Sequence, residues 1–331
     1  MRLPLTLLAL ALSTAAFAES PKTVDDAIAR AKKTHQPVFL DFGAPWCYSC
    51  YFMMTHVLNG PEWEKLESRT VVAEVDADSP DGAAWMKKLQ VKALPAYIVL
   101  NENGDELGRI LAEQPREKFY PAVGKILAGS RTLDELKSSA AKGSTDAIET
   151  VLASYEARKD GQGGLDWYAS LPESVRTKNA KNTTVTLWRD RLELARAMKA
   201  KDDAAAVAAA KRALAGDLGC ERPYVVDTLL EASEKMPDVE RKTMLAAQKP
   251  ALETLLDKSV FVAKPTCADQ RSSVITTADV DEALGDTKSE AAVLDRAIEA
   301  TRKYLGDDLK KDRNAADNLR VYLVRAKRTG E

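Results

Sequence analysis

The sequence is poor in several residue types that common functional sites require. Its 331 residues include two histidines, four cysteines and 6% aromatic side chains. Two histidines leave no room for a His-rich metal site. The net charge of −2 argues against a protein whose main task is to hold nucleic acid or acidic lipid, which calls for a basic surface. The length predicts about two domains at the usual ~150 residues each.

The first 18 residues have the pattern of a secretory signal peptide. Arg2 precedes an apolar run from Leu3 to Leu12, which closes on Ala16, Phe17 and Ala18. One basic residue, a short apolar core and an A-x-A site predict cleavage after Ala18. An uncleaved membrane anchor is the alternative, although the run is short for a bilayer. We therefore expect a periplasmic or secreted protein with no stable membrane span after processing, where cysteine pairs can form disulfides.

The remaining chain divides into a mixed region and a helical region. Four short apolar segments have the composition of buried strands: 38–42, 70–76, 96–100 and 107–111. Four segments have helical patterns: 23–34, 47–58, 81–89 and 115–127. After about residue 128 the strand patterns nearly vanish, and residues 195–215 have very high helix propensity. Helix pairs with irregular breaks predict an all-α, repeat-like (TPR-like) domain over residues 130–331.

Cys47 and Cys50 form a CxxC motif where an apolar strand is followed by the start of a helix. In this position the two sulfurs can meet within one helical turn. We expect Cys47 to face solvent, where unpaired N–H groups at the helix N-terminus stabilise its thiolate. Cys50 would lie further in and attack a mixed disulfide formed by Cys47. Zinc binding and a purely structural disulfide are the alternatives, but the other cysteines do not supply a second pair at zinc-ligand spacing.

The surroundings of the motif resemble the active-site stretch of the thioredoxin family. LDFGAPWCYSC, from Leu40 to Cys50, has an apolar strand with an embedded Asp that leads into WCxxC. KALPAY, from Lys92 to Tyr97, resembles the family's cis-proline loop, and VLNENGDELGRI resembles its closing hairpin. The resemblance covers about residues 23–128 and is nearest to the exported branch with disulfide reductases and isomerase-type domains. It implies an α/β thioredoxin-like domain over residues 19–129.

The resemblance also implies a role for each matching residue. Cys47 would be the nucleophile and Cys50 the resolving thiol, with no dissociable cofactor. Asp41 would be a buried acid that moves a proton at the resolving cysteine, and burial should raise its pKa. The alternative is a strand-edge Asp that faces water. Pro95 would have a cis peptide bond.

Trp46, Leu94 and Pro95 would form the substrate-binding surface, with Trp46 packed beside the disulfide. Several positions depart from the family pattern. Tyr48 and Ser49 replace the Gly-Pro of cytosolic reductases, which leaves the redox direction open. Glu74 stands where a Lys is usual, so a second carboxylate should raise the pKa of Asp41 further.

The second cysteine pair, Cys220 and Cys267, lies in the predicted helical region, and both residues follow helix breaks. We expect a structural disulfide, which can contribute roughly 4 kcal/mol in the chain-entropy model. A second redox relay that exchanges with Cys47 is the alternative.

Thiol–disulfide exchange on exported proteins is the function that these features favour. The partners would be thiols and disulfides of exported clients and a redox protein that recycles Cys47 and Cys50, with no nucleic acid. A non-catalytic adaptor that binds a partner through the helical domain is one alternative, because stacked helices offer a long concave face. A copper-handling protein that uses Met53, Met54 and His56 is another, although methionines in a helix more often fill core gaps.

Overall fold

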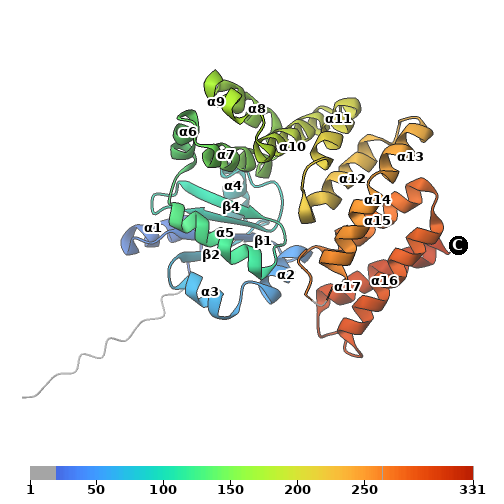
Figure 1. The fold of residues 1–331 in the computed structure, drawn as a ribbon. Helices are drawn as coiled ribbons and strands as arrows, with labels where there is room; N and C mark the ends of the chain where they lie inside the picture. Colours follow the sequence, from blue (N-terminus) through green and yellow to red (C-terminus); the bar gives the residue numbers. More distant parts are fainter. Residues whose placement is uncertain (1–19, 263, 331) are drawn as a thin grey trace, which may run out of the picture.

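The computed structural model describes residues 20–262 and 264–330, so the predicted signal peptide and its cleavage site lie outside the described residues. Figure 1 shows a sheet packed between helices, followed by an arch of helices that curves back to the sheet domain. The predicted fold class, an α/β thioredoxin-like domain followed by a helical one, is confirmed. None of the helices in these ranges is both long and apolar enough to cross a bilayer.

The N-terminal sheet has four strands in the spatial order β2-β1-β3-β4. Their bounds are β1 (Val38–Gly43), β2 (Val71–Asp76), β3 (Ala96–Leu100) and β4 (Glu106–Leu111). β1 pairs parallel with β2 and antiparallel with β3, and β3 and β4 form the expected antiparallel hairpin. The helices are α1 (Val24–Thr34), α2 (Tyr48–His56), α3 (Gly60–Glu67), α4 (Pro80–Lys88) and α5 (Arg116–Gly129). The helical patterns in the sequence did not predict α3.

The two faces of the sheet are covered by different helices. Side chains of β1 alternate between the faces, so Val38, Leu40 and Phe42 pack with α1 and α4. Phe39 packs on the opposite face with residues of α2, α3 and α5. Asp41 and Gly43 share the face of Phe39 by the same alternation. The sheet therefore places the Asp41 side chain under the helix that carries the CxxC motif.

The C-terminal region is a stack of helices joined by short connections. Its elements are α6 (Leu133–Ala141), α7 (Thr145–Ala157), α8 (Gly161–Ser170), α9 (Glu173–Asn179), α10 (Thr183–Ala200), α11 (Asp203–Leu214), η1 (Gly219–Glu221), α12 (Arg222–Ala232), α13 (Asp238–Ala246), α14 (Lys249–Leu255), the π-helical turn η2 (Leu256–Val260), α15 (Gln270–Leu284), α16 (Thr287–Leu305) and α17 (Arg313–Thr329). Helices close in the chain pack on one another, as in the pairs α10–α11, α15–α16 and α16–α17. This packing fits the predicted stack of helix pairs.

The segment of highest helix propensity is not one helix. α10 ends at Ala200, and Lys201 has a left-handed backbone with φ 56°. Asp202 then caps α11, since its side chain accepts the N–H of Ala205 at 3.0 Å. This cap satisfies a backbone donor that a helix start leaves unpaired, and it outweighs the propensity of the alanine-rich residues around it.

The helical stack contacts the sheet domain at both of its ends. Near its start, Arg158 at the end of α7 donates to Glu106 of β4 at 2.7 Å, and Glu106 also pairs with Arg109. Near its end, α17 packs on α2. The stack therefore closes against the helix that carries the CxxC motif (Figure 1).

Candidate active site

Cys47 and Cys50 form a disulfide at the N-terminus of α2, with their Cα atoms 5.2 Å apart. Cys47 is the N-cap of this helix, and its sulfur accepts the backbone N–H of Cys50 at 3.1 Å. The expectation that Cys47 faces solvent with Cys50 further in is wrong, because Cys47 is 6% exposed whereas Cys50 is partly exposed. The capping contact explains the difference, since it turns the Cys47 sulfur back over the first helical turn.

Asp41 lies on a central strand between Glu74 of β2 and Tyr97 of β3. Burial, with a further contribution from the Glu74 carboxylate, raises its pKa to about 7. A Cβ placed on Gly43 would lie 3.7 Å from the Cys50 sulfur, so Cys50 packs on the face that Asp41 shares. The alternative of a strand-edge Asp is therefore wrong. The fold brings a carboxyl group that titrates near neutral pH to the same face as the second cysteine.

The proline loop lies where β3 begins. The Leu94–Pro95 peptide bond is cis, as the resemblance implies, and the Pro95 carbonyl accepts the N–H of Ala112 at 3.0 Å. Leu94 is partly buried against the core cluster on the α1 and α4 side of the sheet. Trp46 does not pack in the core: it is 69% exposed, and its indole N–H donates to Asp78 at 2.7 Å. A large apolar surface is thus held in a fixed orientation next to Cys47.

Two further polar residues belong to this site and were not singled out from the sequence. Glu113 follows β4, and burial together with the Asp269 carboxylate raises its pKa to about 7, while a hydrogen bond with the Ser49 side chain lowers it. Tyr97 is buried, and its hydroxyl has no hydrogen-bond partner in the part of the chain that the structure describes. The position of Tyr97 on the predicted strand, two residues after Pro95, could have identified it from the sequence. No local pattern could have identified Glu113, because Asp269 is distant in sequence.

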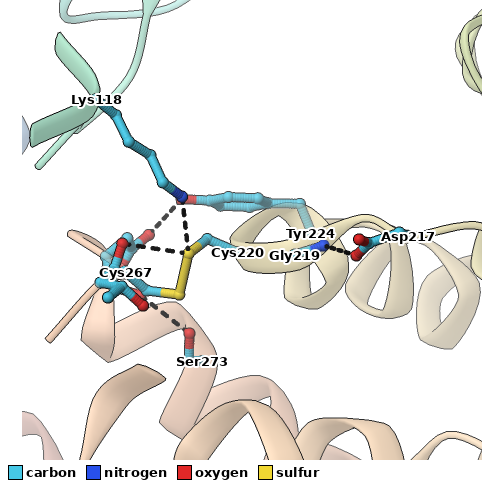
Figure 2. The surroundings of a disulfide bond; sticks show 9 residues. Lys118, Asp217, Gly219, Cys220, Tyr224, Cys267 and Ser273 are labelled. Atoms are coloured by element: carbon cyan, nitrogen blue, oxygen red, sulfur yellow. Dashed lines mark hydrogen bonds between the residues drawn. A yellow bond between two sulfur atoms is a disulfide. The ribbon is translucent and has the colours of Figure 1, made fainter. Parts of the chain in front are cut away.

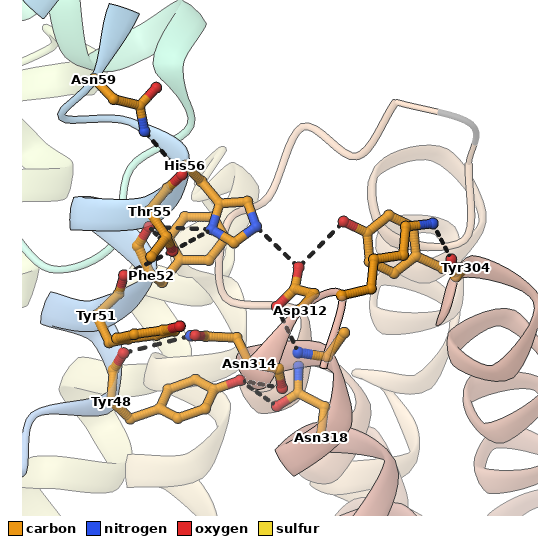
Figure 3. A network of polar contacts seen from close by, with 12 residues as sticks. Tyr48, Tyr51, Phe52, Thr55, His56, Asn59, Tyr304, Asp312, Asn314 and Asn318 are labelled. Carbon is orange, nitrogen blue, oxygen red and sulfur yellow. Dashed lines mark hydrogen bonds and ion pairs between the residues drawn. The ribbon is translucent and has the colours of Figure 1, made fainter. Parts of the chain in front are cut away.

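The end of the helical stack binds α2 through a network of polar contacts (Figure 3). The Tyr48 hydroxyl lies 2.6 Å from the Asn314 carbonyl and 2.8 Å from the Asn318 side-chain oxygen. The Arg271 guanidinium lies over the Tyr48 ring, 4.1 Å from its centroid. One residue between the two cysteines is therefore fixed by the C-terminal region.

His56 at the end of α2 contacts the N-cap of α17. Its Nε2 atom lies 2.9 Å from Asp312 Oδ2, which also accepts from the Tyr304 hydroxyl at 3.1 Å. The hydrogen bond with Asp312 raises the pKa of His56. Burial opposes ionisation of Asp312, but hydrogen bonds from His56 and Ala315 outweigh it and lower its pKa to about 2.

We expect this pair to titrate above the usual histidine range. Because the folded-state pKa of His56 is raised and that of Asp312 is lowered to about 2, the contribution of the pair to stability is fully present between about pH 3.8 and the unfolded histidine pKa of 6.5. It is lost as the pH rises through the folded pKa of His56 or falls through the folded pKa of Asp312. An NMR titration of the imidazole should report a pKa above 6.5, and Asp312→Asn should lower it. The only other histidine is His35, so His56→Gln assigns the signals. An unchanged His56 titration in Asp312→Asn would contradict the pairing.

Met53, Met54 and His56 do not come together as a copper site. Met53 is fully buried in the core, where its sulfur lies 3.3 Å from the Gln114 backbone nitrogen, while Met54 is exposed. His56 is occupied by Asp312. Across residues 20–262 and 264–330 there is no group of three or more His, Cys, Asp or Glu side chains that could hold a metal ion.

Cys220 and Cys267 also form a disulfide, with Cα atoms 5.4 Å apart. It joins η1 to the segment before α15 (Figure 2). Lys118 reaches it from α5 of the sheet domain, and its Nζ atom lies 3.7 Å from the Cys220 sulfur. The second disulfide is therefore at the boundary between the two domains.

Comparisons with known proteins agree with the N-terminal architecture. Residues 24–127 match the family model described as a thioredoxin-like domain. The chain is 36% identical over 85 residues to the thiol:disulfide interchange protein DsbD of Klebsiella pneumoniae, which is 25% of this chain and only 14% of that protein. It is 26% identical over 182 residues to protein disulfide-isomerase 1 of Dictyostelium discoideum, which is 49% of this chain and 45% of the relative.

Solved structures match a similar share of the chain. The C-terminal domain of Neisseria meningitidis DsbD in the oxidised form is 29% identical and aligns with 31% of this chain and 91% of that one, with a TM-score of 0.28. A thioredoxin from Thermus thermophilus is 29% identical over 31% of this chain and 83% of its own, with a TM-score of 0.30. From the family model and the CxxC disulfide, we conclude that residues 24–127 are a thioredoxin-like domain that carries a CxxC disulfide.

Proposed function

We propose that the chain catalyses thiol–disulfide exchange on proteins through Cys47 and Cys50. The observation that carries this proposal is the Cys47–Cys50 disulfide at a helix N-terminus, on the sheet face that also holds Asp41 with a pKa of about 7. The relatives named as thiol:disulfide interchange proteins support it, and they match about a quarter to a third of the chain.

The reaction follows from the positions of the three groups. In the reduced protein, the Cys47 thiolate attacks a client disulfide, and one client sulfur leaves as a thiolate. Cys50 gives its proton to the Asp41 carboxylate and attacks the Cys47 sulfur, which releases the second client sulfur. The product is the Cys47–Cys50 disulfide, and a redox partner must reduce it again. The reverse sequence would donate the disulfide to a client.

The finer parts of the proposal concern location and clients. The signal-peptide pattern of residues 1–18 supports export, with exported proteins as clients. We place the domains at residues 19–129 and 130–331. The exposed Trp46 and the Leu94–Pro95 loop would contact the client next to Cys47, and the helical stack would hold client or partner segments.

Trapping tests this function. In Cys50→Ala the resolving thiol is absent, so mixed disulfides between Cys47 and clients should accumulate in cells and appear as high-mass bands on non-reducing gels. Dithiothreitol should release them, and Cys47→Ala/Cys50→Ala should form none. The proposal fails if Cys50→Ala traps no protein and the purified wild-type chain does not reduce insulin.

A further inference from the structure

One cavity of about 820 Å³ between the domains is lined both by residues adjoining the CxxC pair and by Cys267 of the second disulfide. Tyr48 and Glu113 line it from the thioredoxin-like domain. Tyr48 is next to Cys47 in the chain, and Glu113 is hydrogen-bonded to the Ser49 side chain. Cys267 itself lines it from the helical region, with Asp269 and Arg271, whose guanidinium lies over the Tyr48 ring. The cavity is therefore bounded by the CxxC segment and by one sulfur-bearing residue of the second pair.

A chain of polar groups connects the two walls. The Glu113 carboxyl group is bonded to the Ser49 side chain and is close enough to Asp269 for the two charges to interact. Asp269, two residues after Cys267, accepts from the Tyr224 hydroxyl at 2.6 Å, and Tyr224 is on the helix that follows Cys220 (Figure 2). His56 and Arg271 are the positive groups that face Glu113. Groups that can carry a proton thus lie between the two cysteine pairs.

The second disulfide has the surroundings of a reactive one. Cys267 is 1% exposed, so bulk solvent barely reaches it, but it borders the inter-domain cavity. The Lys118 ammonium, at 3.7 Å from the Cys220 sulfur, can stabilise a thiolate there. A disulfide exchanges fastest when its leaving sulfur forms a stable thiolate. The geometry favours attack on Cys267 from the cavity with Cys220 as the leaving group.

We propose that Cys220–Cys267 is a second redox site that takes electrons from Cys47 and Cys50 across this cavity. The inference rests on the proposed function of the CxxC pair. The Cys47 thiolate attacks the Cys267 sulfur: a Cys47–Cys267 bond forms, the Cys220–Cys267 bond breaks, and Cys220 leaves as a thiolate beside Lys118. For this step the two walls of the cavity must approach to bonding distance.

The second half of the exchange returns the CxxC disulfide. Cys50 gives its proton to Asp41 and attacks Cys47, and Cys267 leaves and takes a proton from Glu113. The pair Cys47–Cys50 is oxidised and the pair Cys220–Cys267 is reduced by two electrons, with no other oxidant or reductant. The helical region would then hold a second dithiol that stores the electrons.

Purified Cys50→Ala, with Cys47 reduced and Cys220–Cys267 oxidised, tests the first step. After dilution, acid quenching, alkylation and peptide mapping, we expect part of the alkyl label on Cys220 rather than on Cys47, together with a Cys47–Cys267 cross-linked peptide. Lys118→Met in the same background should lower the fraction labelled at Cys220 by about threefold, which is the size of a surface charge interaction. A concentration series separates this exchange from reaction between molecules.

The outcomes distinguish the two proposals. If the label stays on Cys47 while that thiol still forms a mixed disulfide with oxidised glutathione, the relay is wrong and the proposed function stands. If Cys47 reacts with neither disulfide, both are wrong.

A second measurement does not depend on trapping. Dithiothreitol should reduce Cys220–Cys267 about tenfold more slowly in Cys47→Ala/Cys50→Ala than in the wild type, since the variant lacks the internal thiolate. Equal rates in the two proteins would overturn the relay.

Discussion

Replacing Asp41 with asparagine should stabilise the folded chain at pH 8 by as much as about 4 kcal/mol. The pKa of this carboxyl group rises from 3.8 to about 7 on folding, and each unit corresponds to about 1.36 kcal/mol. The protonated form is favoured in the fold, so stability is highest below pH 3.8 and falls as the pH rises to about 7. Asparagine has nearly the same shape and no charge, and therefore avoids this loss.

Urea unfolding of wild type and Asp41→Asn at pH 3.5 and pH 8 measures the effect. The two proteins should be nearly equal at pH 3.5 and differ at pH 8, and a difference that is the same at both values would contradict the assignment. Glu74→Gln is the matched control, since it removes the second cause and should lower the pKa of Asp41. If Asp41 also accepts the Cys50 proton, Asp41→Asn should reduce insulin more slowly at pH 8 despite its greater stability.

Removing the second disulfide should lower the free energy of unfolding by an amount of similar size. Cys220→Ala/Cys267→Ala opens a loop with a sequence separation of 47, and the chain-entropy model gives about 4 kcal/mol for such a loop. The loss should appear as a lower midpoint of urea unfolding in the helical region, followed by circular dichroism. Cys267 is also buried in the core of that region, so its truncation adds to the loss.

The CxxC pair provides the comparison for this prediction. Cys47→Ala/Cys50→Ala opens a loop with a separation of 3, for which the same model gives about 2 kcal/mol. The two double variants remove the same number of sulfur atoms, so their difference measures the loop term together with the packing loss at Cys267. Equal losses would show that loop closure is not what the second disulfide contributes.

Local patterns in the sequence were sufficient to predict most elements of the thioredoxin-like domain. Short apolar segments identified the strands, and α1 lies within the predicted helical segment 23–34, where the Thr23 side chain accepts the Asp26 N–H as its N-cap. The CxxC context identified the position of Asp41 because both lie on one strand–helix unit. These features depend on residues close together in the chain.

The parts that could not be predicted depend on distant residues. Glu113 acquires its raised pKa from burial and Asp269, and Tyr48 is fixed by Asn314 and Arg271 from the far end of the chain. Propensity alone also missed the helix break at Lys201, where one capping side chain decides the structure. The predicted exposure of Cys47 was wrong for a related reason, since a single contact between its side chain and the backbone turns its sulfur inward.

The closure of the helical stack on α2 affects how the cleft can open. A domain joined at one end can swing about a hinge. Here the stack is attached near its start by Arg158 and Glu106 and near its end by α17, so the connection near residue 130 cannot act as a free hinge. Opening at α2 must be shared as small angular changes between successive helix pairs, because each pair contacts mainly its neighbours. Separating α17 from α2 would therefore bend the whole stack and not rotate it about one joint.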